Sequence, residues 1–306
     1  MKYILKDITV IIPTYNRKDN VMETLKHIPN TIKEIIIVDQ SNPVELTDLH
    51  MRKDIPIHIM RSEKPSITIA RNKGLQWADS KLIAFIDDDV SVTEKYFEGI
   101  LDVFNNYPDV EGVAGWNITN VSNLKLKMDA ILRGPFGLRV YGEPTFKWPY
   151  SNRYPSGLTE PIQAQWMPGM NMVYKREVFD EYNMRFDENL LGYTLAEDID
   201  FTYRIFKRNP KGLIITPHAP IIHRDAATHR QDVKKISYIN QVDHLYFAMK
   251  HNMIGKWWYN IFWITILRTL MAPVRFSKWR YYMSSLGYCL THWKLIKSGK
   301  VREWQN

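Results

Sequence analysis

The sequence predicts an α/β fold with a mostly parallel central sheet and helices on both faces. Three runs of consecutive apolar, largely β-branched residues carry this prediction, at residues 8–12, 34–38 and 82–86. Such runs are typical of strands that are buried on both faces, as in a parallel sheet. Stretches with apolar residues at helical spacing separate them, and this alternation favours parallel strands joined by right-handed crossovers.

The other elements follow in order along the chain. Helices are expected at 17–28, at 66–78 with Ser66 as N-cap, at 93–107, at 175–182, and from Glu197 to just before Pro210. Further strands are expected at 110–116, 171–174, 213–216 and 220–222. The pattern weakens between 117 and 163, where several Gly and Pro predict a long irregular segment over a ligand site.

Composition divides the chain into a near-neutral body and a basic, aromatic C-terminal part. Hydrophobic residues make up 45% of the 306 residues, which predicts a packed core rather than disorder. Residues 233–306 carry twelve of the 41 Lys and Arg, only two of the 33 Asp and Glu, and six of the ten Trp. We therefore expect a catalytic domain at 1–230, with halves at 1–116 and 117–230, and a helical extension at 231–306.

Three consecutive carboxylates, Asp87, Asp88 and Asp89, directly follow the strand expected at 82–86. Aspartate is common in turns, so a solvated strand-end turn is one interpretation. The other is a ligand site, because α/β sheets bind ligands beyond the carboxyl ends of their strands. Carboxylates suit hard divalent cations, and such a cation neutralises a departing diphosphate.

Six segments, in the right order, resemble the family 2 glycosyltransferases, which share the GT-A fold. The resemblance covers roughly residues 8–225 and implies an inverting transfer of a sugar from a nucleotide-sugar. The six segments are VIIPTYNR (10–17), EIIIVDQSN (34–42), ARNKG (70–74), FIDDD (85–89), PGMNMVYKREVF (168–179) and AEDIDFTYRI (196–205).

The resemblance implies a set of residues that bind the nucleotide-sugar. Asp39 would contact the base, and an aspartate that accepts an imide N–H favours a UDP- or dTDP-sugar, with GDP donors left open. Trp166 and Met167 either wall the sugar site or belong to the core, and Arg17 is expected as a solvated first-turn residue. The implied donor-binding residues are Pro13, Thr14, Tyr15, Asn16, Asp39, Arg71, Asp87, Asp88 and Gly169.

The resemblance also implies that Asp198 is the base that deprotonates the acceptor hydroxyl, with Glu197 orienting the acceptor. The residues alone are compatible with this role, although acidic side chains are common in the first turn of a helix. Asp200 lies two positions further on and is expected to face elsewhere.

A metal site for Mn²⁺ or Mg²⁺ is implied at the end of the triplet. Asp89 is expected to coordinate the cation directly, and Asp87 or Asp88 to contact the ribose, or the ion through water. Of three later histidines, His223 fits best, while His218 and His229 are equally explained as loop residues.

The tail contains two aromatic, basic segments, 257–274 and 278–297. Arg268 near the middle of the first makes a membrane span costly, so we expect an interfacial helix on an anionic membrane surface. Packing on the catalytic domain or a homodimer interface are the alternatives. An interfacial tail would bring the site to a lipid-linked acceptor or another glycan. No signal-like segment opens the chain and it has one cysteine, Cys289, so we expect a peripheral protein on the cytoplasmic face of the membrane.

Three other functions compete with glycosyl transfer. A nucleic-acid-binding protein is disfavoured because the basic residues lie among Trp and Ile rather than on a polar stripe. A catalytically inactive nucleotide-sugar-binding or scaffold protein is disfavoured by the complete acidic triplet and Glu197-Asp198 pair. A nucleotidyltransferase is disfavoured because PTYNR (13–17) contains no glycine.

Overall fold

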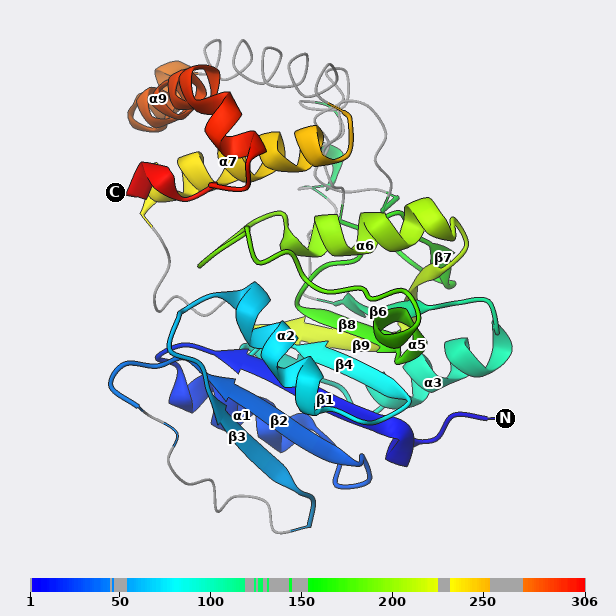
Figure 1. Ribbon diagram of the computed structural model, residues 1–306. Helices are drawn as coiled ribbons and strands as arrows, with labels where there is room; N and C mark the ends of the chain where they lie inside the picture. The colour runs from blue at the N-terminus through cyan, green and yellow to red at the C-terminus, as the bar shows by residue number, and fades with distance from the viewer. Residues whose placement is uncertain are drawn as a thin grey trace.

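The computed structural model describes residues 2–44, 46, 54–118, 124, 126–128, 131, 143–144, 154–224, 232–253 and 272–305. Its strands form one nine-stranded sheet in the order β3-β2-β1-β4-β8-β6-β9-β5, with β7 beside β9 (Figure 1). The strands are β1 Ile8–Thr14, β2 Glu34–Asp39, β3 Ile57–Arg61, β4 Leu82–Ile86, β5 Val90–Val92, β6 Gly112–Asn117, β7 Ile162–Gln163, β8 Asn171–Lys175 and β9 Leu213–His223.

The helices cover both faces of this sheet, as the sequence predicts. One core cluster joins α1 and α3 to the sheet, and a second joins α2, α5 and α6 to the opposite face. Along β1, Val10 and Ile12 face the first cluster and Ile11 faces the second, which explains the unbroken apolar run. The helices are α1 Lys18–His27, α2 Ile67–Trp77, α3 Tyr96–Asn106, α5 Glu177–Asp180, α6 Glu197–Arg208, α7 Val233–Lys250 and α9 Ala272–Lys297, with short 3₁₀ turns at Leu5–Asp7 and Glu303–Gln305.

The parallel part of the sheet sets the position of the functional site. Strands β3, β2, β1 and β4 run parallel, so β1, β2 and β4 end at one edge. Strand β8 runs antiparallel to β4 and begins at that same edge, with Asn171 opposite Ile86. Strand β9 ends there too, because His223 pairs with Val90 of β5.

Several boundaries differ from the sequence prediction. Strand β3 has no counterpart among the expected elements, and β5 separates the acidic triplet from α3, which begins only at Tyr96. The two strands expected at 213–216 and 220–222 are one strand, with a register shift opposite Gly115 and Trp116 of β6. The helix expected at 175–182 is the single turn α5, because Lys175 still pairs in β8.

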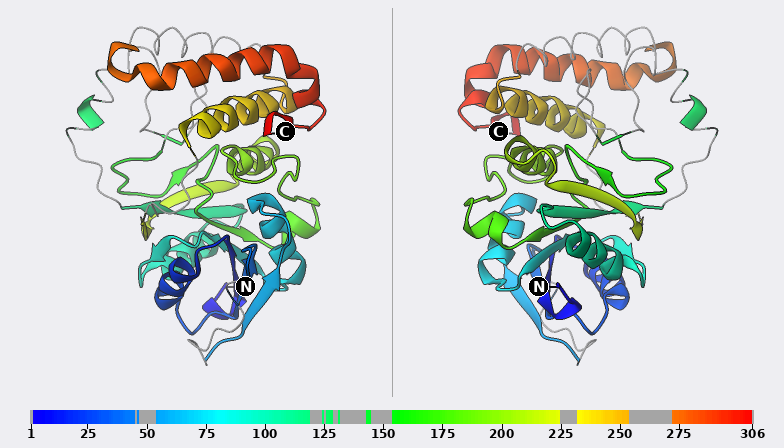
Figure 2. Two further views of the ribbon diagram at one scale, coloured as in Figure 1. Left: turned by 90° about the vertical axis from the view of Figure 1, so that its left-hand side faces the viewer. Right: turned by 90° about the vertical axis from the view of Figure 1, so that its right-hand side faces the viewer.

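The C-terminal extension forms two further layers beyond α6. Figure 2 shows α6 between the sheet and α7, with α9 lying on the far side of α7. A separate cluster that includes Leu245, Cys289 and Ile296 joins α7 to α9. Most of the segment 257–274 and most of the expected irregular segment lie outside the described residues. Among the helices that are described, none has the length and apolar character needed to cross a bilayer.

Candidate active site

The predicted site residues come together where β1, β2, β4, β8 and β9 end or begin at one edge of the sheet (Figure 1). Asp87 follows β4, and its backbone N–H donates to the carbonyl of Met170 in the turn before β8 (3.1 Å). This bond joins the acidic triplet to the segment that contains Gly169. Two segments more than eighty positions apart in the sequence therefore lie side by side in the site.

Asp88 is the most buried member of the triplet. Its carboxylate accepts hydrogen bonds from the hydroxyl of Thr14 (2.8 Å) and the guanidinium of Arg17 (3.1 Å). Burial raises the pKa of Asp88 to about 7, against the lowering effect of Arg17. Arg17 also lies 3.3 Å from Asp89, so its expected role as a solvated first-turn residue is wrong. This cation instead belongs to the site.

Asp89 and His223 form a pair at the outer end of the triplet. Oδ1 of Asp89 lies 3.1 Å from Nε2 of His223, which the β5–β9 register brings alongside. Burial opposes ionisation of Asp89, but the hydrogen bond and charge of His223, together with Arg17, hold its pKa below the usual range. His218 is exposed and its backbone packs on Gly99 of α3, while His229 lies outside the described residues.

Arg71 links the triplet to the Glu197-Asp198 pair. Its guanidinium is completely buried and donates to Oδ1 of Asp87 (3.0 Å), the carbonyl of Gly169 (2.9 Å) and Oε1 of Glu197 (3.2 Å). The family resemblance implies that this arginine binds the donor. In the structure its contacts are with the carboxylates, so its observed role is to position them.

Asp198 is held by backbone amides at the start of α6. Oδ2 accepts from the N–H of Gly169 (2.8 Å) and Oδ1 from the N–H of Ile199 (2.7 Å). A Cβ on Gly169 would lie 3.1 Å from the Cβ of Asp198 and 3.2 Å from Nη2 of Arg71, so a side chain at this position would press on both residues. Burial raises the pKa of Asp198, and the two amides and Arg71 oppose that rise.

Glu197 is buried beside Asp198. Burial first, and then the charge of Asp198, raise the pKa of Glu197 to about 8. Since Asp198 accepts two backbone N–H bonds, it loses its proton before Glu197 does. Of the two carboxyl groups, Asp198 therefore ionises first, and its charge helps Glu197 to keep a proton.

The first strand-to-helix turn and the end of β2 form the remaining side of the site. Asn16 adopts a left-handed backbone (φ 53°), and its N–H donates to the hydroxyl of Ser41 (2.8 Å). Asp39 is 1% exposed and accepts from the N–H of Ser41 (2.8 Å) and from Arg61 (3.4 Å). Thr14 is bonded to Asp88, Pro13 is buried within β1, and the ring of Tyr15 is 40% exposed.

Burial decides between the two roles that the sequence left open for Trp166 and Met167. Trp166 and Met167 are both completely buried in core clusters, so neither walls a sugar site.

Two residues at the site were not predicted from the sequence, Arg224 and Tyr193. Arg224 donates to the carbonyl of Asp88 (2.9 Å) and to Thr24 (2.7 Å). Its position directly after His223 was the one feature of the sequence that pointed to the site. Burial and the charges of Glu197 and Asp87 raise the pKa of Tyr193, whose ring is half exposed; nothing in the sequence indicated this placement.

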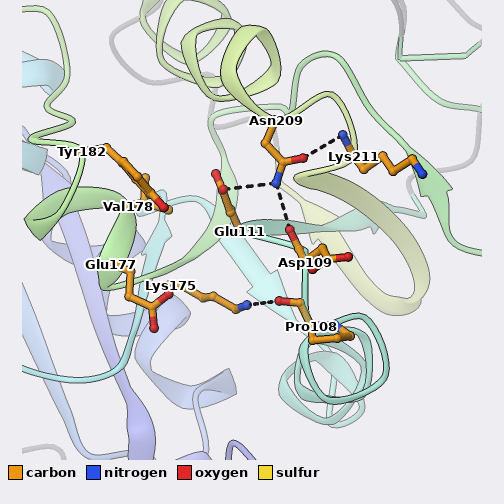
Figure 3. Close-up of a pocket in the computed structure, with 9 residues that line it drawn as sticks. All are labelled: Pro108, Asp109, Glu111, Lys175, Glu177, Val178, Tyr182, Asn209 and Lys211. Atoms are coloured by element: carbon orange, nitrogen blue, oxygen red, sulfur yellow. Dashed lines mark hydrogen bonds between the residues drawn. The ribbon is translucent and has the colours of Figure 1, made fainter.

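A pocket of about 350 Å³ lies at the opposite edge of the sheet (Figure 3). Its walls come from the residues that precede β6 and β9 and from the end of β8. None of the predicted site residues lines it, so it is not the donor site. The lining residues are Pro108, Asp109, Glu111, Lys175, Glu177, Val178, Tyr182, Asn209 and Lys211.

Asp89 and His223 are of residue types that bind divalent cations, and the two side chains lie close enough together to serve as two protein ligands of one ion. Within the described ranges, no three His, Cys, Asp or Glu side chains gather closely enough to enclose an ion. Mg²⁺ and similar ions are commonly bound by one or two side chains, with phosphate oxygens and water completing the shell. A carboxylate with an imidazole is compatible with Mn²⁺ as well.

Comparison with known proteins identifies the family. The family model described as "Glycosyl transferase family 2" matches residues 9–183, more than half of the chain. The chain belongs to glycosyl transferase family 2. Its activity is glycosyl transfer, and its fold is GT-A.

Among its relatives, the uncharacterized glycosyltransferase EpsJ of Bacillus subtilis is 24% identical over 260 residues, which cover 76% of this chain and 70% of EpsJ. The structure of GalNAc-T7 with UDP, GalNAc and Mn²⁺ is similar with a TM-score of 0.55 at 16% identity, over 81% of this chain and 51% of that one. S. aureus TarS 1–349 in complex with UDP-GlcNAc gives a TM-score of 0.54 at 13% identity, over 98% and 88% of the two chains. This chain thus spans about half of GalNAc-T7, and at these identities the two structures support the fold alone.

Proposed function

We propose that this glycosyltransferase moves a hexosyl or deoxyhexosyl group from a UDP- or dTDP-sugar to a hydroxyl of a glycan or lipid-linked acceptor, with inversion, in the synthesis of cell-surface polysaccharides or glycoconjugates. One observation carries the proposal. The guanidinium of Arg71 bonds to Asp87 on the donor side and Glu197 on the acceptor side, while the Gly169 segment holds Asp198. The triplet and the base therefore face one reaction centre.

The proposed chemistry assigns the proton to Asp198. As the acceptor oxygen forms its bond to the anomeric carbon, the bond to the diphosphate breaks and its electron pair leaves with the diphosphate. The acceptor proton passes to the carboxylate of Asp198, which ionises before Glu197 does. Asp89 and His223 would hold a divalent cation, which when bound offsets the charge of the leaving diphosphate.

The donor preference rests on Asp39. Its carboxylate lies at the end of β2 and is fixed by Ser41 and Arg61, and an acceptor at this position suits the imide N–H of uracil or thymine.

The membrane association is proposed from the surface of α9. Leu290 and Trp293 are 49% and 41% exposed there, next to Lys294 and Lys297. Exposed apolar side chains beside cations suit the interface of an anionic membrane and would place the enzyme at a lipid-linked acceptor on the cytoplasmic face. Co-sedimentation with vesicles of phosphatidylglycerol, compared with phosphatidylcholine vesicles, measures this binding. Equal binding to both kinds of vesicle, or to neither, would contradict it.

The test of the function is Asp198→Asn. The release of UDP or dTDP from a panel of their sugars with Mn²⁺ is measured with and without para-nitrophenyl glycosides as acceptors. We expect the rate to fall by roughly 10²- to 10⁴-fold, since the general base is lost. UDP should stabilise the variant against heat as it does the wild type. Asp180→Asn, an exposed aspartate at the end of α5, serves as the control. Wild-type turnover in Asp198→Asn would disprove the assignment of Asp198 as base, whereas a wild type that turns over none of the sugars would favour a binding or scaffold role.

A further inference from the structure

Helix α7 of the C-terminal extension lies along the segment that contains the Glu197-Asp198 pair. Oδ2 of Asp243 accepts from the hydroxyl of Thr194 (2.7 Å) and the N–H of Leu195 (3.1 Å). One turn later, Phe247 packs in a cluster with Ile199. These contacts fix α7 against both sides of the Glu197-Asp198 pair.

His244 occupies the turn of α7 between these two contacts. Its neighbour Asp243 touches the residues just before the pair, and Phe247 touches the residue just after it. Positions 244 and 247 share one face of a helix. The ring of His244 therefore lies opposite Glu197 and Asp198, and the charge of Asp198 acts on it.

The two ring nitrogens of His244 have different surroundings. Nδ1 lies 2.6 Å from the carbonyl of Asn240 in the preceding turn, so in the neutral ring Nδ1 carries the hydrogen and Nε2 holds a lone pair. Because Nδ1 is tied to its own helix, Nε2 points away from α7. Among the residues that the structure describes, none forms a hydrogen bond with Nε2.

A histidine that only fills the core would be fully buried with both nitrogens paired. His244 instead keeps part of its surface accessible, as do Asp198 and Asp87 across the site. Burial still lowers the pKa of His244, against the raising effects of Asn240, Asp243 and Asp198. A neutral imidazole with an open lone pair thus faces the proposed base.

We propose that His244 is an acceptor-binding residue, whose Nε2 accepts a hydrogen bond from a second hydroxyl of the acceptor sugar while the reacting hydroxyl faces Asp198. This inference rests on the proposed role of Asp198. It also gives the extension a part in the reaction, because the acceptor side of the site is then incomplete without α7.

The test separates transfer to a sugar from transfer to water. Wild type, His244→Phe and His244→Gln are assayed with the UDP-sugar that wild type hydrolyses fastest, Mn²⁺ and para-nitrophenyl glycosides as acceptors. Loss of one hydrogen bond predicts an acceptor KM about tenfold higher in His244→Phe. Hydrolysis should be unchanged, because water has no second hydroxyl for Nε2 to hold. The glutamine amide oxygen should restore part of the affinity.

The matched control is His292→Phe. This histidine makes the same contact with the carbonyl four residues earlier, from Nδ1 to Tyr288 (3.1 Å), but on the exposed side of α9. It should leave both reactions at the wild-type rate. An unchanged acceptor KM in His244→Phe overturns the inference, even where Asp198→Asn has abolished turnover. Full hydrolysis by Asp198→Asn instead overturns the proposed function.

A second measurement needs no acceptor. Diethyl pyrocarbonate acylates unprotonated, accessible imidazole nitrogens, and peptide mass spectrometry locates the product. We expect modification of His244 in the native protein within about a factor of ten of the exposed His292, since His244 is partly exposed and its Nε2 has no partner among the described residues. Complete protection of His244 in the native protein would show a closed ring and overturn the inference.

Discussion

The first turn of α6 carries carboxylates with opposite properties, Glu197 and Asp198 on one side and Asp200 on the other. Glu197 and Asp200 are both buried, at 6% and 1% exposure. Burial raises the pKa of Glu197 to about 8. Burial also acts on Asp200, yet His251, Arg204 and Lys250 lower its pKa to about 2.

The difference lies in the number of cations for each carboxylate. Asp200 bonds to two cations, Arg204 (3.0 Å) and Lys250 (2.9 Å), and to the imidazole of His251 (2.9 Å). Lys250 ends α7, and His251 follows it. Among the residues that the structure describes, Glu197 bonds to one cation, Arg71, which it shares with Asp87. Burial alone therefore does not decide ionisation. A carboxylate surrounded by cations becomes a structural link, and a pair that shares one cation keeps a proton available at neutral pH.

The largest effect on stability is expected from removing Arg71, the cation that Glu197 and Asp87 share. Arg71→Met would remove this counter-charge from the buried Glu197 and from the partly buried Asp87 and Asp198. We expect a loss of about 3–5 kcal/mol in the free energy of unfolding, measured by urea denaturation. Glycosyl transfer should be lost with it. Arg71→Lys keeps the charge but not the planar fork that reaches three acceptors, so it should recover stability only in part. Wild-type stability in Arg71→Met would show that these carboxylates do not depend on a shared cation.

The next effect is expected from Asp200→Asn, which removes the anion from the α6–α7 link. We expect a loss on the order of 2–3 kcal/mol at pH 7, since Arg204 and Lys250 are partly exposed. The pKa of Asp200 is depressed, so its contribution is present above about pH 4 and disappears as pH falls toward 2.

The wild type and Asp200→Asn should therefore become equally stable in acid. Asp180→Asn breaks an exposed pair with Arg176 that has the same spacing, and its effect should be much smaller. Equal losses in the two variants would contradict the assignment of Asp200 as a buried link.

The smallest effect is expected from Glu197→Gln, and it appears in the pH dependence. The folded protein keeps a proton on Glu197 up to about pH 8, whereas the unfolded chain releases it near its ordinary value. The contribution of Glu197 is thus full in acid and is lost as pH rises from about 4.5 to about 8. Glutamine stays neutral, so the midpoint temperature of thermal unfolding should fall less over that range in the variant than in the wild type. Parallel stability curves for the two proteins would show that Glu197 titrates normally.

The sequence by itself determined the sheet, the order of its strands along the chain and the place of the triplet. Runs such as residues 8–12 and 82–86 are apolar because both faces of β1 and β4 are buried, and this pattern is local. The placement of the triplet follows from the rule that parallel strands end at one edge. The short strands β3 and β5 escaped prediction because Ile57–Arg61 lies at the sheet edge and Val90–Val92 has only three residues.

Only the tertiary structure decided the roles within the site. Arg17, Arg71 and Arg224 are ordinary basic residues in the sequence, and their partners lie up to 204 positions away. Asp200 holds α6 and α7 together because the packing of α7 on α6 places Lys250 and His251 beside it. The residues around Asp200 in the sequence carry no information about that packing. The same holds for His244, whose place beside Asp198 follows from the docking of α7 on α6.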